Sequence, residues 1–390
     1  MPITSLPQPT TPRSDEAPLL RWGILGPGWI ADQMAAAMRR RTTQILQAVA
    51  SRDLARAEDF AQRWEVGSAY GSYEQLVADP RIDVVYVATP HHLHLPHALL
   101  AIEAGKHVLI EKPVGLDAGE ARAIDAAAAA AGVFAMEAMW TLFLPKYDVI
   151  RQLLADGALG RVHTVLADMG EAFPAGHRIF RADLAGGPML DLGTYPATII
   201  SWFLGADLRV AGAVAQNVPA GMTGAGGAGD GGAGGDIGGR TDDEGDGGTG
   251  PGLNGEISAT LTGAGTADAA GQSGGSGRTA QFHATILGET PTRASIVGDA
   301  GALWIDRHFY RPGPFTVRQA GAEPLTWDEP RVDHDGLHFE VAETARRIAA
   351  GEQGSPIRPF TDTIATLELM DSIRAAVGVD FPQARAAREV

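Results

Sequence analysis

The stretch RWGILGPGWIAD, residues 21–32, decides the fold. Its apolar first half predicts a buried strand, and a G-x-G-x-x-A motif follows at residues 26–31, where a helix is expected to begin. Glycines at this place let the backbone approach a pyrophosphate, which the N-terminus of the helix attracts. The alternative is an ordinary glycine turn. The strand before it and the helix after it favour a dinucleotide site formed by Gly26, Gly28, Trp29 and Ile30.

Strands and helices alternate from this motif to about residue 131. Apolar runs typical of buried parallel strands occur at Leu20–Leu25, Ile45–Ala50, Val84–Ala88 and Val108–Ile110. Segments with helical spacing or strong helix formers lie between and after them, at Ala31–Arg40, Leu54–Trp64, Leu95–Ala104 and Ala118–Ala131. This order predicts an α/β domain of the Rossmann type, with a doubly wound parallel sheet.

The pattern changes in the second half of the chain. Strand-like runs dominate from Val162 to Val317, interrupted by one helical stretch near Asp191–Leu204. We expect an α+β domain with an open, mostly antiparallel sheet, closed by helices at Leu337–Ala350 and Thr361–Ala376. The predicted division is a disordered tail at residues 1–18, a dinucleotide-binding domain at 19–137, and a substrate and oligomerisation domain at 138–390.

Glycine is concentrated in one region of the second half. About 23 of the 50 glycines lie between residues 219 and 278, with almost no large apolar side chains to offset the entropy of ordering the backbone. We expect two mobile loops, at about 219–255 and 263–278. The alternating segment Glu256–Thr262 between them predicts a strand, so the loops interrupt a sheet.

Composition excludes several classes of function. The net charge of −16 disfavours binding to nucleic acid or to an anionic membrane surface. The chain has no cysteine, so disulfides, thiolate metal sites and cysteine nucleophiles are excluded. No apolar run is long enough to cross a bilayer, and the first residues lack the pattern of a secretion signal. We expect a cytoplasmic protein.

The end of the second strand indicates which dinucleotide is bound. An NAD site usually has an acidic residue there, which binds the ribose 2′-hydroxyl. Here the strand ends in Ser51 and Arg52, and a guanidinium next to a hydroxyl suits a 2′-phosphate. The sequence therefore favours NADP. NAD stays possible because Asp53 follows one residue later, and Arg52 could also be a solvated surface charge.

Two motifs predict the catalytic groups. Lys112, one of only three lysines, ends the strand HVLIE, where a sheet of this type presents its ligand cleft. Its ammonium can bind a substrate hydroxyl and stabilise a developing alkoxide. Asp191 and Tyr195 lie four residues apart and share one face of the expected helix. Tyr195 would act as a base once a nearby lysine lowers its pKa. The alternatives are that Lys112 is a strand-end lysine in solvent, that Asp191 caps a helix and that Tyr195 is an aromatic residue of the packing.

Histidines are clustered at residues 91, 92, 94 and 97, but no set of carboxylates accompanies them, and we expect no metal site. His91 and His92 are expected at the mouth of the cleft. Trp140 and Phe143 are candidates for the wall of the substrate pocket, although core packing explains each of them equally well.

Several segments resemble the glucose-fructose oxidoreductase and inositol dehydrogenase family (Gfo/Idh/MocA). The resemblance runs from about Leu20 to Pro382, outside the glycine loops, and rests on VVYVATPHHLHLPHALLAIEAGKHVLIEKPV, EAMWTLFLP, GGPMLDLGTYP and ELMDSIRAAVGVDFP. The spacing between the EKP and D-x-G-x-Y motifs is specific to this family. The sequence is most similar to the branch of dimeric dihydrodiol and NADP-dependent aldose dehydrogenases. The resemblance implies that the cofactor site also includes Thr89, Pro90, His94, Glu111, Lys112 and Pro113.

The resemblance implies hydride transfer between NADP and a sugar or vicinal diol, with Lys112 and Asp191 in the site and Tyr195 transferring the proton. Oxidation and the reverse reduction are both open. Two alternatives are an oxidoreductase that keeps its nicotinamide bound between two sugars, and a non-catalytic NADP-binding regulator. The family also implies a homodimer or homotetramer that packs through the open sheet.

This sequence departs from the family pattern in two places. Leu142 stands where an arginine is common, and the glycine loops interrupt the sheet expected for assembly.

Overall fold

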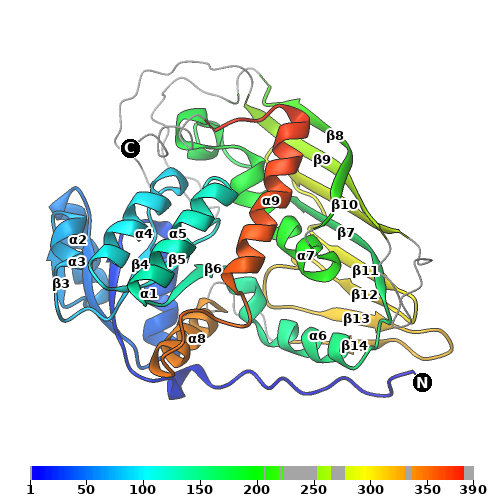
Figure 1. Cartoon of the computed structure of the whole chain (residues 1–390), viewed down its shortest axis with the longest axis horizontal. Helices are drawn as coiled ribbons and strands as arrows, with labels where there is room; N and C mark the ends of the chain where they lie inside the picture. Colours follow the sequence, from blue (N-terminus) through cyan, green and yellow to red (C-terminus); the bar gives the residue numbers. More distant parts are fainter. Residues whose placement is uncertain are drawn as a thin grey trace.

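The fold was examined in a computed structural model of the 390-residue chain (Figure 1). It describes residues 2–205, 207–219, 222, 253–264, 277–329 and 336–381. Most of the predicted glycine loops therefore lie outside the described residues. A six-stranded sheet and an eight-stranded sheet form the two halves of the molecule.

The first half contains a wholly parallel sheet with strand order β3-β2-β1-β4-β5-β6. Its strands are β1 (Arg21–Leu25), β2 (Ile45–Ala50), β3 (Ser68–Tyr70), β4 (Val84–Val87), β5 (His107–Glu111) and β6 (Ala135–Ala138). The helices of this half are α1 (Trp29–Arg41), α2 (Leu54–Trp64), α3 (Tyr73–Val77), α4 (His94–Glu103) and α5 (Ala118–Ala131). The predicted Rossmann sheet is confirmed.

Local sequence explains where these elements form. The central strand β4 consists of valine and tyrosine, and β5 carries valine, leucine and isoleucine between His107 and Glu111. These apolar side chains have almost no exposed surface, as expected for a parallel sheet covered by helices on both faces. Helices α2, α3 and α5 begin behind side chains that cap their first backbone amides, namely Asp53, Ser72 and Asp117. The helix α1 begins at Trp29, directly after Gly28, without such a cap.

The second half contains a sheet with strand order β14-β13-β12-β11-β7-β10-β9-β8. All neighbours are antiparallel except β7 and β10, so the predicted mostly antiparallel sheet is confirmed. Its strands are β7 (Val162–Gly170), β8 (Arg209–Asn217), β9 (Asn254–Gly263), β10 (Arg278–Thr285), β11 (Ala294–Gly298), β12 (Ala302–Ile305), β13 (Phe315–Arg318) and β14 (Leu325–Trp327). Its accompanying helices are α6 (Pro145–Ala155), α7 (Thr194–Leu204), α8 (His338–Ala349) and α9 (Phe360–Val377).

The end of the chain joins the two halves. The helix α9 packs against α5 of the first half and α7 of the second, and lies between the sheets in Figure 1. The helix α8 packs against α1. The C-terminal helices therefore contact elements of both halves of the chain.

The N-terminal segment differs from the expected disordered tail. In Figure 1 it runs along the lower edge of the molecule, and Ser14 and Ala17 are buried. Nδ1 of His338 lies 2.7 Å from the Ser14 hydroxyl, and the Thr10 hydroxyl donates to the carboxylate of Asp148 at 3.0 Å. The Pro-, Ser- and Thr-rich composition of the segment predicts disorder. Its contacts could not be predicted, because the partners on α8 and α6 are remote in sequence.

The outer face of the second sheet is exposed. Leu166, Val214 and Trp304 point to solvent from β7, β8 and β12, with 45%, 67% and 41% of their surface accessible. Within the part of the chain that the structure covers, no helix has both the length and the apolar character needed to cross a membrane.

Candidate active site

A cavity of about 690 Å³ opens at the carboxyl ends of the parallel strands, facing the second sheet. This is where sheets of this type bind ligands, and the volume suits a cofactor together with a small substrate. The predicted residues that line it are Gly26, Gly28, Trp29, Ile30, Ser51, Arg52, Thr89, Pro90, His91, His92, His94, Glu111, Lys112, Trp140, Asp191 and Tyr195.

The glycine turn forms a cradle at one end of the cavity. A Cβ atom on Gly28 would stand in open space, and no side chain caps the first amides of α1. At Gly26, φ is +92°, and a Cβ there would lie 3.0 Å from the carbonyl oxygen of Ala88. A side chain at Gly26 is thus excluded by conformation and by space. The amides at the start of α1, beside an open glycine, fit the phosphates of a dinucleotide.

Two arginines lie at the same end of the cavity, one just after β2 and one in α2. Arg52 and Arg56 both line it, and neither forms an ion pair with any described residue. The Asp53 carboxylate accepts a hydrogen bond from the amide of Ala55 at 3.0 Å, so it caps α2. The acidic residue that could favour NAD is therefore engaged in capping, while the guanidinium groups face the cavity unpaired.

Lys112 enters the cavity from the end of β5, before a cis peptide bond to Pro113. Its ammonium donates a hydrogen bond to the backbone oxygen of Asp191 at 2.9 Å and lies 4.7 Å from the centre of the Tyr195 ring. Burial lowers the pKa of Lys112, against the opposing effect of the Asp191 and Glu111 carboxylates. The predicted meeting of the amine and the phenol is present in the structure.

Tyr195 lies in the first turn of α7, directly after a π-helical turn at Met189–Gly193. Its hydroxyl accepts a hydrogen bond from the indole N–H of Trp140 at 3.0 Å, and its ring packs on Tyr310, with 4.7 Å between ring centres. Burial raises the pKa of Tyr195, and the Trp140 hydrogen bond offsets only part of this effect. The expected lowering of its pKa is not found, because the Lys112 ammonium lies over the ring face and not at the hydroxyl.

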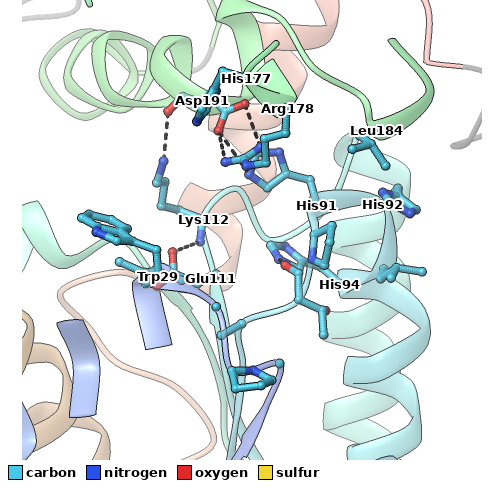
Figure 2. A pocket seen from close by; sticks show the side chains of 18 of the residues that line it. Trp29, His91, His92, His94, Glu111, Lys112, His177, Arg178, Leu184 and Asp191 are labelled. Atoms are coloured by element: carbon cyan, nitrogen blue, oxygen red, sulfur yellow. Dashed lines mark hydrogen bonds and ion pairs between the residues drawn. The ribbon is translucent and has the colours of Figure 1, made fainter. Parts of the chain in front are cut away.

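Asp191 lies among Arg178, His91 and Lys112, as Figure 2 shows; burial lowers the pKa of His91 well below its usual value, so its ring is neutral near pH 7. Arg178 donates to its carboxylate at 2.7 Å, and Nε2 of His91 lies 3.8 Å from the same oxygen. Burial opposes the charge of Asp191, but Arg178, His91 and Lys112 together outweigh burial and hold its pKa far below the usual range. The carboxylate therefore stays ionised and fixed at neutral pH.

Glu111 lies beneath Lys112 and is buried. Its carboxylate accepts hydrogen bonds from the Tyr86 hydroxyl and, at 3.1 Å, from the backbone amide of Lys112. Burial raises the pKa of Glu111 to about 7.

His94 connects two turns of the cavity wall. Its ring nitrogens lie 2.8 Å from the carbonyl oxygen of Pro113 and 2.7 Å from that of Thr89, and burial lowers its pKa to about 4. It thereby holds the turn after β4 against the turn that carries Lys112.

Three residues singled out from the sequence do not line the cavity. Pro113 lies just behind Lys112, and Phe143 is buried in the core, so the packing interpretation of Phe143 is the one that the structure supports. Leu142 is also buried in the core. Among the described residues, no group of three His, Asp or Glu side chains could hold a metal ion.

The structure adds residues that sequence reasoning missed. These line the face of the cavity that the second half of the chain contributes: Met169, Glu171, Phe173, His177, Arg178, Leu184, Leu192, Tyr310 and Arg311. They come from the end of β7, the loops before α7 and the turn after β12. Apart from Leu192, none belongs to a motif, so only their convergence in three dimensions identifies them.

Both halves of the chain match a known protein family. A family described as an oxidoreductase family with an NAD-binding Rossmann fold matches residues 20–139, and the GFO/IDH/MocA C-terminal domain matches residues 147–304. The trans-1,2-dihydrobenzene-1,2-diol dehydrogenases of Danio rerio and Mus musculus are 32% and 31% identical to the chain, with 93% of the chain and 98% of each relative covered.

Solved structures share the architecture. KijD10, a 3-ketoreductase from Actinomadura kijaniata solved in complex with NADP and TDP-benzene, is 25% identical with a TM-score of 0.72, covering 92% of this chain and 98% of that one. The aldose-aldose oxidoreductase of Caulobacter crescentus is 21% identical with a TM-score of 0.72, covering 92% and 97%, and shows a shared fold only.

Proposed function

Because the chain belongs to the GFO/IDH/MocA family of oxidoreductases, we propose that it is an NADP-dependent dehydrogenase acting on the CH–OH group of a sugar or vicinal diol. One observation carries the proposal: the Lys112 ammonium and the Tyr195 phenol lie together in the cavity that the glycine turn also lines. The names of the relatives agree with such a substrate.

The chain's residues divide the cavity into two parts. The amides after Gly28 would hold the pyrophosphate, and Ser51 and Arg52 would bind the adenosine end. The nicotinamide of NADP supplies a hydride acceptor or donor when bound. The remaining part, next to Lys112 and Tyr195, is left for the substrate.

Tyr195 and Lys112 have separate roles in the proposed reaction. Since burial keeps the Tyr195 phenol protonated, it is ready to donate a proton to the substrate oxygen during carbonyl reduction, and it takes the proton back during oxidation. The Lys112 ammonium, held by the Asp191 carbonyl, stabilises negative charge on that oxygen. The Trp140 indole keeps the Tyr195 hydroxyl oriented.

In the proposed site, Asp191 accepts a hydrogen bond from the substrate, and Arg178 supports the Asp191 carboxylate. The ionised Asp191 carboxylate can accept a hydrogen bond from a second substrate hydroxyl, next to the one that reacts. Arg178 fixes the carboxylate in place. An acceptor of this kind suits both a sugar and a vicinal diol.

The proposal is tested by mixing the purified chain with NADP or NAD and a panel of aldoses, inositols and trans-1,2-cyclohexanediol, and following absorbance at the nicotinamide band. We expect reduction of NADP with at least one of them. A chain that transfers no hydride in either direction, with either cofactor, would contradict the proposal.

The reaction rate should depend on pH in a direction set by Tyr195. Oxidation needs the phenolate, and the raised pKa of Tyr195 means that the ionised fraction grows about tenfold per unit of pH below that pKa. We expect kcat/KM for oxidation to rise steadily from pH 7 to 9, while reduction, which uses the phenol, stays level or falls. Steady-state rates in both directions would show this; an oxidation rate that is level across the same range would speak against Tyr195 as the base.

Arg52 should set the preference for NADP. Replacing it with alanine removes an unpaired guanidinium from the cavity, and we expect KM for NADP to rise about 10- to 100-fold, with little change for NAD. Arg209→Ala, at an exposed arginine on β8, is the matched control. Equal changes for both cofactors would indicate that Arg52 does not contact a 2′-phosphate.

We also propose that the chain forms a homo-oligomer. The exposed Leu166, Val214 and Trp304 on the outer face of the second sheet support a homodimer or homotetramer formed through that face. A cytoplasmic location stays a prediction.

A further inference from the structure

Tyr310 is a second phenol beside Tyr195, and it has no role in the mechanism above. It lines the cavity from the turn between β12 and β13 and is almost wholly buried. Its ring contacts that of Tyr195, with 4.7 Å between ring centres and 36° between planes, and it meets the Trp140 ring edge-on at 6.4 Å. Trp140 in turn donates its indole hydrogen bond to the Tyr195 hydroxyl. The three aromatic side chains therefore form one cluster around the proposed proton donor.

The backbone of Tyr310 is anchored by the segment 141–147, which directly follows Trp140. Three successive carbonyl oxygens, those of residues 309–311, each accept a hydrogen bond from a buried side chain of that segment. The donors, in the order of the carbonyls, are the Tyr147 hydroxyl at 3.0 Å, the Thr141 hydroxyl at 2.9 Å and the Lys146 ammonium. Because losing a buried hydrogen-bond partner is costly, the turn that carries Tyr310 is fixed before any substrate arrives.

The far end of the same turn is fastened by Glu329, just beyond β14. Its carboxylate accepts a hydrogen bond from the amide of Gly313 at 3.3 Å. Burial raises the pKa of Glu329, and the charge of Lys146 opposes this effect, so the two charged groups lie near each other. The turn is therefore held on both sides.

The Tyr310 hydroxyl already has a partner within the chain. Arg311 donates a hydrogen bond to it, and the Arg311 guanidinium carbon lies 5.1 Å from the centre of the Tyr310 ring. Burial raises the pKa of Tyr310, so the phenol stays neutral next to Tyr195. Tyr310 therefore contacts Tyr195 through an uncharged ring of fixed position.

Proton transfer from Tyr195 requires its hydroxyl to lie at the reacting oxygen. A misplacement of about 1 Å can cost about 100-fold in rate. The Trp140 hydrogen bond restrains the hydroxyl, but the last torsion of a tyrosine side chain has a broad range, so the plane of the ring needs a further contact. The Tyr310 ring supplies such a contact.

We propose that Tyr310 is a positioning residue for the reaction: anchored by the segment 141–147, it sets the ring of Tyr195, and with it the hydroxyl, for proton transfer. The proposal rests on the dehydrogenase function proposed above and deepens it. It concerns the proton-transfer step alone and assigns no part of the substrate to Tyr310.

A double-mutant cycle tests the proposal. kcat and KM are measured with NADP and the aldose, inositol or diol that the wild type oxidises fastest. We expect Tyr310→Leu to lower kcat about 10- to 100-fold while KM for NADP stays within about twofold. Tyr310→Phe, which keeps the ring, should stay within about threefold of the wild-type kcat. The double variant Tyr195→Phe/Tyr310→Leu should be no slower than Tyr195→Phe alone, because Tyr310 acts through the Tyr195 hydroxyl.

Thr141→Val tests the anchor separately, and it carries the test if Tyr310→Leu does not fold. Valine keeps the shape of the side chain but cannot donate to the Tyr310 carbonyl, so we expect kcat to fall about 3- to 10-fold with KM for NADP unchanged. Thr42→Val is the matched control. The Thr42 hydroxyl donates to the carbonyl oxygen of Met38 at 2.7 Å, at the end of α1, and its loss should leave kcat at the wild-type value. Thermal unfolding and NADPH binding show which variants are folded.

Three results would each overturn the positioning role while leaving the dehydrogenase intact. They are losses that multiply in the double variant, a Tyr310→Phe variant as slow as Tyr310→Leu, and a Thr141→Val variant with wild-type kcat. A wild type that transfers hydride to or from none of these compounds would overturn the proposed function itself, and the role of Tyr310 with it.

Discussion

Replacing Tyr195 with phenylalanine is expected to lower kcat about 10²- to 10⁴-fold, with a smaller effect on cofactor binding. The substitution removes the hydroxyl that accepts the Trp140 hydrogen bond and keeps the ring that packs on Tyr310. The fold should therefore be maintained while the proton donor is lost. Steady-state kinetics in both directions, together with NADPH binding by fluorescence, would separate the two effects.

A matched control for this variant is Tyr70→Phe. Tyr70 lies on β3 and donates its hydroxyl to Asp79 at 2.9 Å, outside the cavity. Its removal should leave kcat within about twofold of the wild type. If Tyr195→Phe retained wild-type turnover, the proton would have to move through another group, and the proposed mechanism would be wrong.

Lys112→Met should have the second large effect. Methionine has a similar length but no charge, so negative charge on the substrate oxygen loses its stabilising ammonium. We expect kcat/KM to fall about 10²- to 10³-fold. Burial already lowers the pKa of Lys112, which indicates that its charge is costly to keep in the cavity. Thermal unfolding should therefore occur at the same temperature as in the wild type or higher.

Lys106→Met is the control for this substitution. The Lys106 ammonium donates to the carbonyl oxygens of Asp79 and Ile82 at 2.8 Å, so its role is structural. We expect this variant to unfold at a lower temperature but to retain kcat. The opposite result, a stable Lys106→Met with low kcat and an active Lys112→Met, would remove Lys112 from the mechanism.

Much of the fold could be predicted because local patterns determine it. The strands β1, β2, β4 and β5 were expected at their observed positions within a residue or two, since fully buried parallel strands are continuous apolar runs. The short strands β3 and β6 were not predicted, because three or four residues carry little periodicity. The helix α6 was not predicted, because it begins directly after buried residues of the preceding turn.

The site could be predicted only where it lies on motifs. Lys112, Asp191 and Tyr195 stand on recognisable segments, and the structure brings them together. Arg178, Glu171 and Arg311 belong to loops whose meeting depends on the packing of distant elements. The direction of the Tyr195 pKa shift also could not be predicted from the sequence, because it depends on burial and on the position of the Lys112 ammonium.

In the proposed reaction, a hydride passes to NADP beside Lys112 and Tyr195. Its most direct test is the oxidation of aldopyranoses deuterated at C1, with mass spectrometry of the NADPH that is formed. We predict one deuterium per NADPH for the wild type, with a rate of transfer at least 10²-fold lower in Lys112→Met and Tyr195→Phe. NADPH without deuterium, or equal transfer rates in the wild type and both variants, would contradict the account.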